Sequence, residues 1–166
     1  LEEPEAHMHP QMQQVFIKNI KRFLTENGDC AQVIITTHSS HILAESGLDD
    51  KKGFDRIRYF DKSRHKITVR DLSELKILED PENTKKFLRQ YLTLHKCDLF
   101  FADKIILVEG PTERMLLPQM LKLISDSLQN EYISIVEVGG AYAHRFKDLL
   151  EFINVKTLII TDIDSV

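Results

Sequence analysis

Several residue types and patterns are scarce in this 166-residue sequence. It has no tryptophan and two cysteines, Cys30 and Cys97, which lie far apart and form no Cys-x-x-Cys pair. This spacing argues against a disulfide framework or a cysteine-based zinc site, and it favours a reducing, cytoplasmic setting. No apolar run approaches the roughly 20 residues that span a membrane. The first residues are acidic where a signal peptide would be basic, so we expect no membrane partner and no secretion.

Glycine is scarce as well, with six residues in the chain. None of them is followed by lysine, so the sequence has no GxxxxGK[ST] loop of the kind that binds nucleotide phosphates. The chain also begins without methionine. We therefore expect these residues to be part of a longer protein.

The charges nearly balance, since 22 basic and 26 acidic side chains give a net charge of −4. This balance excludes a uniformly basic protein, although a local basic face remains compatible with nucleic-acid binding. Residues 51–70 hold eight lysines and arginines against two aspartates. The simpler interpretation of this segment is a solvated hairpin face, and contact with phosphates is the alternative.

Hydrophobic spacing predicts five elements in the first part of the chain: a helix over 11–25, a buried strand over 32–37, a short helix up to Ser46, and a pair of strands over 54–60 and 66–69. A second stretch, residues 71–102, is predicted to be mainly helical, with a break at Asp80 and Pro81. This stretch would connect the two parts of the chain.

From residue 104 onward, strands and helices alternate. The predicted strands cover 104–108, 132–138 and 156–161, and the predicted helices cover 112–128 and 142–153. This alternation indicates an α/β fold in which helices cover a parallel sheet. In such sheets, functional residues gather beyond the carboxyl ends of the strands.

Acidic residues lie at these strand ends. Glu109 and Gly110 follow the first strand, Asp162 and Asp164 end the last one, and Glu113 lies on the first turn of the intervening helix. If the two strands are neighbours, Glu109 meets the aspartates at the edge of the sheet. Grouped carboxylates suit Mg²⁺, which prefers oxygen ligands and activates water beside a phosphodiester. The simpler alternative is that Glu113 only caps its helix.

The first ten residues, LEEPEAHMHP, are dense in polar side chains. One alternative is a zinc cluster of His7 and His9 with His38 and His41. A second alternative needs no function, because glutamates near a helix N-terminus are favoured by the helix dipole. The third is an ATPase site.

The segment ILVEGPTE over 106–113, followed by IITDID over 159–164, resembles the Toprim domain of topoisomerases, DnaG-type primases and OLD-family nucleases. The resemblance implies that Glu109, Asp162 and Asp164 bind catalytic Mg²⁺ (or Mn²⁺) and that Glu113 assists a second metal. The run over 138–140, Val-Gly-Gly, resembles the family's glycine turn after the second strand.

The first ten residues resemble the Walker B and D-loop stretch of ABC-type ATPases, in the form found in OLD and RecF-like proteins. The run over 34–39 resembles the strand that ends in their switch histidine. This resemblance implies that Glu2 holds the Mg²⁺ of ATP, that Glu3 polarises the attacking water, and that His38 senses the γ-phosphate.

In this order, the two halves resemble the OLD (overcoming lysogenization defect) family, which includes Gabija-type and retron-associated nucleases. The resemblance implies three segments: the C-terminal part of an ABC-type ATPase domain over 1–75, a helical connector over 76–103, and the N-terminal part of a Toprim nuclease domain over 104–166.

The implied function is a metal-dependent DNA endonuclease that is regulated by ATP and serves in antiphage defence. The same resemblance implies a homodimer or larger assembly and a helicase-like or retron partner. Two alternatives stay open at this point: a nucleotide-gated DNA sensor or scaffold that does not cut, and a RecF-like repair ATPase.

Overall fold

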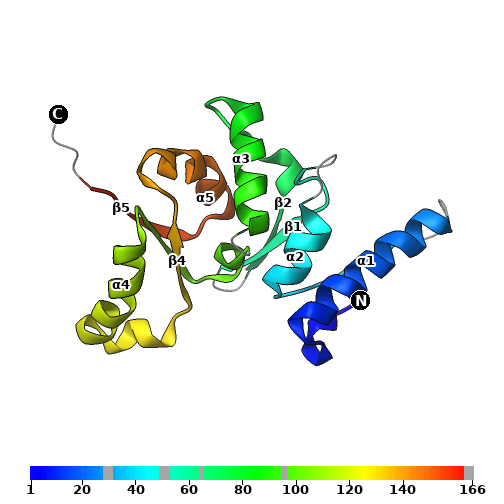
Figure 1. Cartoon of the computed structure of the whole chain (residues 1–166), viewed down its shortest axis with the longest axis horizontal. Coiled ribbons are helices and arrows are strands. Elements are labelled where there is room, and N and C mark those ends of the chain that lie inside the picture. Colours follow the sequence, from blue (N-terminus) through cyan, green and yellow to red (C-terminus); the bar gives the residue numbers. More distant parts are fainter. Residues whose placement is uncertain (28–31, 49–52, 64–65, 95–96, 163–166) are drawn as a thin grey trace.

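The computed structural model describes residues 1–27, 32–48, 53–63, 66–94 and 97–162 of an α/β protein. Figure 1 shows α1 and α2 at one end of the molecule and α4 at the other, with α3 and the β1–β2 hairpin between them. The helices are α1 (Pro10–Glu26), α2 (Ser40–Gly47), α3 (Pro81–Leu94), α4 (Pro111–Ile124) and α5 (Lys147–Ile153). The strands are β1 (Arg58–Ser63), β2 (Lys66–Asp71), β3 (Lys104–Val108), β4 (Ile133–Glu137) and β5 (Lys156–Ile160). Within the described residues, no helix is both long enough and apolar enough to cross a membrane.

The two N-terminal helices pack against each other and form where the sequence predicts them. Helix α1 begins at Pro10, whose fixed φ suits a first helical position. Helix α2 is capped by Ser39, whose hydroxyl oxygen accepts hydrogen bonds from the amides of His41 and Ile42. The Ser39 hydroxyl also donates to Oε1 of Gln13, a buried side chain of α1, over 2.5 Å. This contact fixes the start of α2 relative to α1.

The prediction of a buried strand over residues 32–37 is wrong. Its described residues form a single parallel bridge, from Thr36 to Glu2, and Ile34 is 71% exposed. The apolar run favours a strand, but a strand also needs partners along its length. Among the residues that the structure describes, the backbone hydrogen bonds of this run join Ile34 and Thr36 to Leu1 and Glu3, too few for a ladder.

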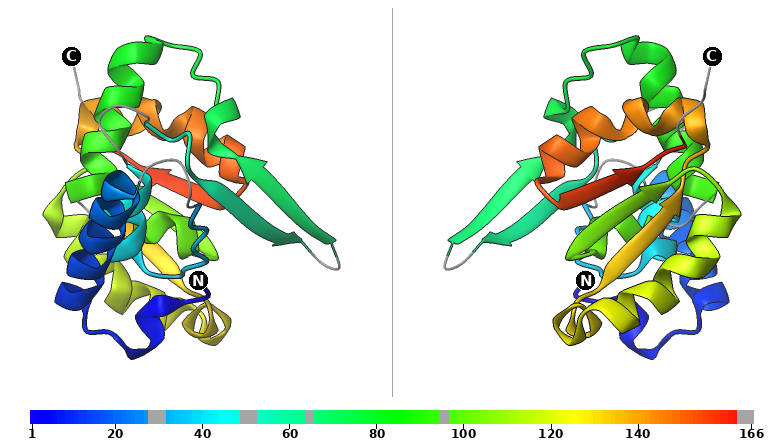
Figure 2. Two further views of the ribbon diagram at one scale, coloured as in Figure 1. Left: turned by 90° about the vertical axis from the view of Figure 1, so that its right-hand side faces the viewer. Right: turned by 90° about the vertical axis from the view of Figure 1, so that its left-hand side faces the viewer.

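Strands β1 and β2 form the predicted antiparallel hairpin, which projects from the body of the molecule (Figure 2). Two of its basic side chains are paired within the hairpin: Arg58 with Asp71 over 2.8 Å and Arg70 with Asp61 over 3.7 Å. The first strand differs from the prediction of 54–60, since β1 begins at Arg58 and continues through residues 61–63 of the predicted turn. The remaining turn residues, 64 and 65, lie outside the described residues. These ion pairs favour the interpretation of the hairpin as a solvated face.

The connector is helical only in its second part. A 3-10 turn over Leu72–Glu74 is followed by extended chain, in which buried Leu75 and Ile77 alternate with exposed residues. The prediction of helix up to residue 80 is therefore wrong, because a period of two governs this stretch. Helix α3 then opens at Pro81, directly after Asp80 with its positive φ of 44°.

The C-terminal part is a parallel three-stranded sheet in the order β4–β3–β5, and each predicted strand is confirmed to within two residues. The predicted helix over 112–128 ends as α4 at Ile124 and continues as the 3-10 helix η5 (Asp126–Asn130). The predicted helix over 142–153 consists of the 3-10 helix η6 (Gly140–Phe146) followed by α5. Helices α3 and α5 lie on one side of the sheet and α4 on the other (Figures 1 and 2).

One hydrophobic core joins the described chain from Leu48 onward, and α2 packs against it through Leu43 and Ala44. It runs from Leu48 and the hairpin base through α3 to the sheet and α5, and its largest fully buried side chains include Phe146, Leu72, Leu88, Leu92, Leu107 and Leu149. Just before β3, the 3-10 helix η4 (Asp98–Phe101) adds Leu99 and Phe100 to this core. The connector is thus a packed part of the molecule, and it holds the first part of the chain against the sheet.

Candidate functional site

The carboxyl ends of β3 and β5 bring two predicted site residues together. The strands pair in parallel up to Val108 and Ile160. Directly beyond these ends, the Asp162 amide donates a hydrogen bond to Oε2 of Glu109 over 2.9 Å, although 53 positions separate the two residues. The prediction that Glu109 and the end of the last strand meet is therefore confirmed for Asp162. Asp164 lies outside the described residues.

Glu113 is turned back toward the same place by the start of α4. Its Oε2 accepts a hydrogen bond from the Gly110 amide over 3.1 Å, so it caps the helix as the simpler alternative expected. A Cβ atom at position 110 would lie 3.3 Å from this oxygen, which is why glycine suits the close approach. We call Glu109, Glu113 and Asp162 the carboxylate edge.

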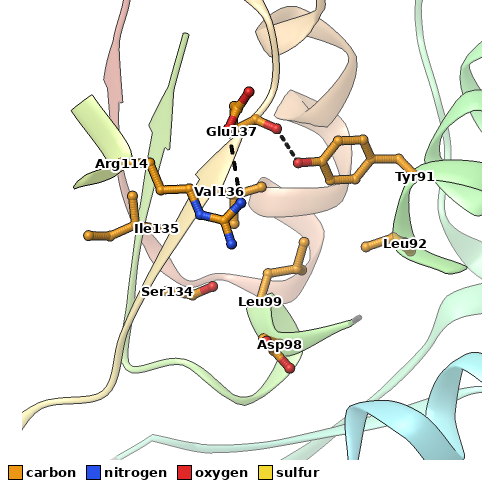
Figure 3. Close-up of a pocket in the computed structure, with 9 residues that line it drawn as sticks. All are labelled: Tyr91, Leu92, Asp98, Leu99, Arg114, Ser134, Ile135, Val136 and Glu137. Carbon is orange, nitrogen blue, oxygen red and sulfur yellow. Dashed lines mark hydrogen bonds and ion pairs between the residues drawn. The ribbon is translucent and has the colours of Figure 1, made fainter. Parts of the chain in front are cut away.

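Another acidic residue at a strand end, Glu137, was missed in the sequence although it ends β4. Its carboxylate Oε2 lies 4.0 Å from Nη1 of Arg114 on α4. Its backbone carbonyl accepts a hydrogen bond from the hydroxyl of Tyr91 on α3, a tyrosine whose pKa burial raises to about 12. Figure 3 shows both contacts in the pocket beside β4. The rule that singled out Glu109 also points to Glu137 when it is applied to every strand.

The donor set of the carboxylate edge fits a hard divalent cation. Its side chains offer carboxylate oxygens only, and among the described residues none of the three forms an ion pair with a lysine or arginine. Carboxylates that are grouped without a positive partner favour a cation. Over residues 1–27, 32–48, 53–63, 66–94 and 97–162, however, no three His, Cys, Asp or Glu side chains are grouped closely enough to hold a metal ion. The metal-binding roles of Glu109, Glu113, Asp162 and Asp164 thus stay predictions.

The predicted ATPase residues lie on two neighbouring segments at the N-terminus. The Glu3 amide donates to the Thr36 carbonyl over 2.9 Å, and the Thr36 amide donates to the Leu1 carbonyl over 3.0 Å. This parallel alignment brings Glu3 to His38, whose Nε2 lies 3.1 Å from the carboxylate Oε1. Both side chains are half or more exposed, and Glu2 next to them is exposed too.

The zinc alternative gains no support from this geometry. His38 pairs with a glutamate, and its described neighbours form no group of three metal-binding side chains. His7 lies in the 3-10 helix η1 (Pro4–His7), and His9 is the residue before α1. The roles of Glu2, Glu3 and His38 in binding and hydrolysing ATP stay predictions.

Glu5 has a positioning role beside His38 that its place in the sequence did not reveal. Its Oε1 accepts hydrogen bonds from the Thr37 hydroxyl over 2.8 Å and from the His38 amide over 2.6 Å. Burial alone would raise its pKa, but hydrogen bonds from the Glu5 and His38 amides and from Thr37 outweigh burial and place the pKa below its ordinary value of 4.5. Glu5 thereby fixes the backbone that carries His38. Its place two residues after Glu3 was the only sequence signal.

A ring contact links His38 to the second part of the chain. The imidazole and the Phe101 ring lie 6.2 Å apart between centroids, at an interplanar angle of 62°. Phe101 is the last residue of η4, and β3 begins three residues later and leads to Glu109. The two candidate sites are therefore connected through one short segment.

Comparison with known protein families gives two matches along the chain. Residues 100–164 match the family described as "Overcoming lysogenization defect protein-like, TOPRIM domain". Residues 1–43 match the family described as "AAA ATPase domain". These two ranges contain the two candidate sites described above.

Similar proteins cover nearly the whole chain. It is 37% identical to "Endonuclease GajA" of Bacillus cereus (strain HuB5-5), 30% to "Old nuclease" of Escherichia phage P2 and 29% to "OLD nuclease" of Thermus scotoductus. The matches cover 99%, 99% and 84% of this chain but 26%, 27% and 25% of the relatives, so the chain spans about a quarter of their length. With an ATPase segment followed by a Toprim segment of this type, the chain belongs to the overcoming lysogenization defect (OLD) family.

Proposed function

We propose that the full-length protein is a metal-dependent DNA endonuclease whose cutting is controlled by ATP at its N-terminal segment. The observation that carries this proposal is the hydrogen bond from the Asp162 amide to Glu109, with Glu113 turned toward the same strand end. Parallel strand ends that gather carboxylates provide ligands for a hard cation. The names of the relatives, which are nucleases and endonucleases, support the same reaction class.

In this proposal, Glu109, Glu113, Asp162 and Asp164 hold Mg²⁺ or Mn²⁺. When bound, the metal supplies an activated water molecule and stabilises the charge that develops on the phosphodiester. The chain's own contribution is orientation. Backbone amides at Asp162 and Gly110 fix the carboxylates of Glu109 and Glu113 before substrate arrives, so these groups need little rearrangement during the reaction.

The N-terminal segment would bind and hydrolyse ATP. Glu2 would hold its Mg²⁺, Glu3 would polarise the attacking water, and His38 would sense the γ-phosphate. The 3.1 Å contact between Glu3 and His38 supports this division of roles, because both groups would then face the same phosphate. We infer that the His38–Phe101 contact carries the nucleotide state to β3 and so to the carboxylate edge.

We infer the biological setting from the family resemblance. It comprises antiphage defence, a homodimer or larger assembly, a helicase-like or retron partner, and a cytoplasmic location. Light scattering on the full-length protein measures the assembly directly, and a monomeric full-length protein would contradict the inferred dimer.

The test of the proposed function is a plasmid-cleavage assay with the full-length protein in Mg²⁺ or Mn²⁺. We expect Asp162→Ala to abolish cutting, while Asp126→Ala, in η5 at the other end of the sheet, cuts like the wild type. Undiminished cutting by Asp162→Ala would contradict the assignment. A wild-type protein that binds DNA but leaves the plasmid intact would favour the alternative of a nucleotide-gated sensor.

A further inference from the structure

Three side chains form a cluster that neither candidate site uses. Phe87 of α3 and Tyr142 of η6 stack with their ring centroids 5.2 Å apart and an interplanar angle of 22°. The Cζ atom of Arg145 lies 5.4 Å from the Phe87 centroid and 5.6 Å from the Tyr142 centroid. We call these residues the aromatic–arginine cluster. Because its members come from two elements, the cluster is not visible as a sequence motif.

Tyr142 and Arg145 follow the carboxyl end of β4, the strand that pairs with β3. The Val138 amide donates to the Val108 carbonyl over 2.9 Å, which extends the pairing of β4 with β3 to the residue before Glu109. Gly139 then turns the chain with a positive φ of 67°, and the Tyr142 amide donates back to its carbonyl over 3.1 Å. A Cβ atom at position 139 would lie 3.7 Å from Cδ2 of Tyr142, so the ring rests on this glycine. Neighbouring strands are about 4.8 Å apart, so the Gly139 turn lies next to the strand that leads into Glu109.

The cluster is rigid on its inner side and open on its outer side. Phe146, which is fully buried, contacts Phe87 edge to face with centroids 5.7 Å apart. Tyr142 is 46% exposed. Phe87 supports the Tyr142 ring by stacking, and Tyr142 remains nearly half exposed, so a ligand can reach a ring that is already held in place.

The cluster also carries a positive charge that the described residues do not neutralise. Within that part of the chain, Arg145 forms no ion pair with a carboxylate, and its recorded partners are the two rings. Glu109 and Glu137 end the two neighbouring strands, and the nearby Arg114 lies within ion-pair distance of Glu137, so a polyanion arriving here needs a further cation. An arginine beside exposed aromatic rings is the arrangement that binds single nucleic-acid strands.

We propose that the aromatic–arginine cluster is a strand-binding subsite, in which the exposed Tyr142 ring stacks on an unpaired nucleobase and Arg145 contacts an adjacent phosphate. This inference rests on the proposed function, because it positions the phosphodiester at the carboxylate edge. Stacking on one base and contact with one phosphate fix both the register and the direction of the strand. Loss of the stack should therefore weaken binding and raise KM more than it lowers kcat.

The experiment measures strand binding by the full-length protein, by fluorescence anisotropy with Ca²⁺ in place of Mg²⁺ to prevent cutting. Two probes of equal length are compared: a labelled single-stranded oligonucleotide and the same strand with every base replaced by an abasic residue. We expect the wild type to prefer the strand with bases, and Tyr142→Ala to bind that strand about tenfold more weakly while binding the abasic strand unchanged. Tyr142→Phe keeps the ring and should retain the preference.

Two further variants separate stacking and charge from a general loss of structure. Tyr132 is 49% exposed at the amino end of β4, so Tyr132→Ala removes a matched ring from the opposite end of the sheet and should bind like the wild type. Arg145→Gln should weaken the binding of both probes equally. It should also lower the slope of log affinity against log salt by about one, the effect of losing one phosphate contact. If Tyr142→Ala melts early, Tyr142→Leu keeps the apolar contact with Phe87 but lacks a π-face, and it should lose the preference.

The outcomes distinguish this inference from the proposed function. If folded Tyr142→Ala or Tyr142→Leu keeps the wild-type preference for bases while the wild type cuts plasmid, the subsite is contradicted and the nuclease proposal stands. If the wild type shows a base preference that depends on Tyr142 but never cuts in Mg²⁺ or Mn²⁺, the nuclease proposal is contradicted and the subsite stands. A wild type that binds neither single-stranded probe contradicts the subsite, and the plasmid assay then decides the nuclease proposal by itself.

Discussion

The amide of Asp162 donates a hydrogen bond to the carboxylate of Glu109 over 2.9 Å, across the ends of two parallel strands. This bond joins the two halves of the Toprim motif, which the sequence separates by a helix, a strand and a second helix. It also leaves the second oxygen of Glu109 without a partner among the described residues. The carboxylate is therefore held in place and still able to bind a cation.

The pair of Glu3 and His38 predicts a specific defect in ATP hydrolysis. In the full-length protein, Glu3→Gln should still bind ATP, because the fold of this segment depends on the Glu3 backbone. It should hydrolyse ATP about 100-fold more slowly, since the polarising charge is lost. Phosphate release and nucleotide binding measure the two steps. His7→Ala is the matched control: a defect as large as that of His38→Ala would favour the zinc alternative.

The ring contact between His38 and Phe101 predicts that Phe101→Leu uncouples the two sites. The leucine fills most of the space but lacks the ring, so ATP hydrolysis should be unchanged. The cutting rate with ATP divided by the rate without ATP should come closer to one by a factor of at least about five. A factor of this size corresponds to a typical coupling energy between two sites. Phe60→Leu, at an exposed position of the hairpin, should leave this ratio unchanged. Unaltered ATP control in Phe101→Leu would show that the signal takes another route.

The lowered pKa of Glu5 predicts that the stability difference between the wild type and Glu5→Gln depends on pH. Because its pKa in the folded protein lies below the ordinary 4.5, its hydrogen bonds stabilise the fold above that pH, and this stabilisation is lost as the pH falls through the lowered pKa. Glu5→Gln should therefore have a lower Tm than the wild type at about pH 7, and the gap should narrow steadily below about pH 4.5. Calorimetry at several pH values measures this difference in Tm. A gap that stays constant with pH would contradict the role of this charge.

The Toprim sheet was predictable because its central strand is a continuous buried run. Residues 104–108 are apolar after the first lysine and have an acid at their end, and parallel pairing with short crossovers leaves few arrangements. The segment over 32–37 carries a similar apolar run, yet its described residues pair at one position, Thr36. Apolar character alone does not specify which segment pairs with it.

The contacts that hold the sites were less predictable than the site residues. Glu5 binds the Thr37 hydroxyl and the His38 amide, 32 and 33 positions away, and no spacing rule connects them. Phe87 and Tyr142 likewise come from helices that precede and follow β3 and β4 in the chain. Such contacts follow from how elements pack, whereas the acidic residues at strand ends follow from the sequence order alone.

Metal binding by the full-length protein tests the central claim most directly. Titration calorimetry with Mn²⁺, without ATP or DNA, compares the wild type with Glu109→Gln and with Asp103→Asn. The amide oxygen introduced by Glu109→Gln would still accept the Asp162 hydrogen bond, and Asp103 accepts a similar bond from the Tyr132 amide, over 2.8 Å, at the opposite end of the sheet. We predict that Glu109→Gln weakens Mn²⁺ binding about 100-fold or more and that Asp103→Asn leaves it unchanged. Equal Mn²⁺ affinity in the wild type and Glu109→Gln would contradict the account.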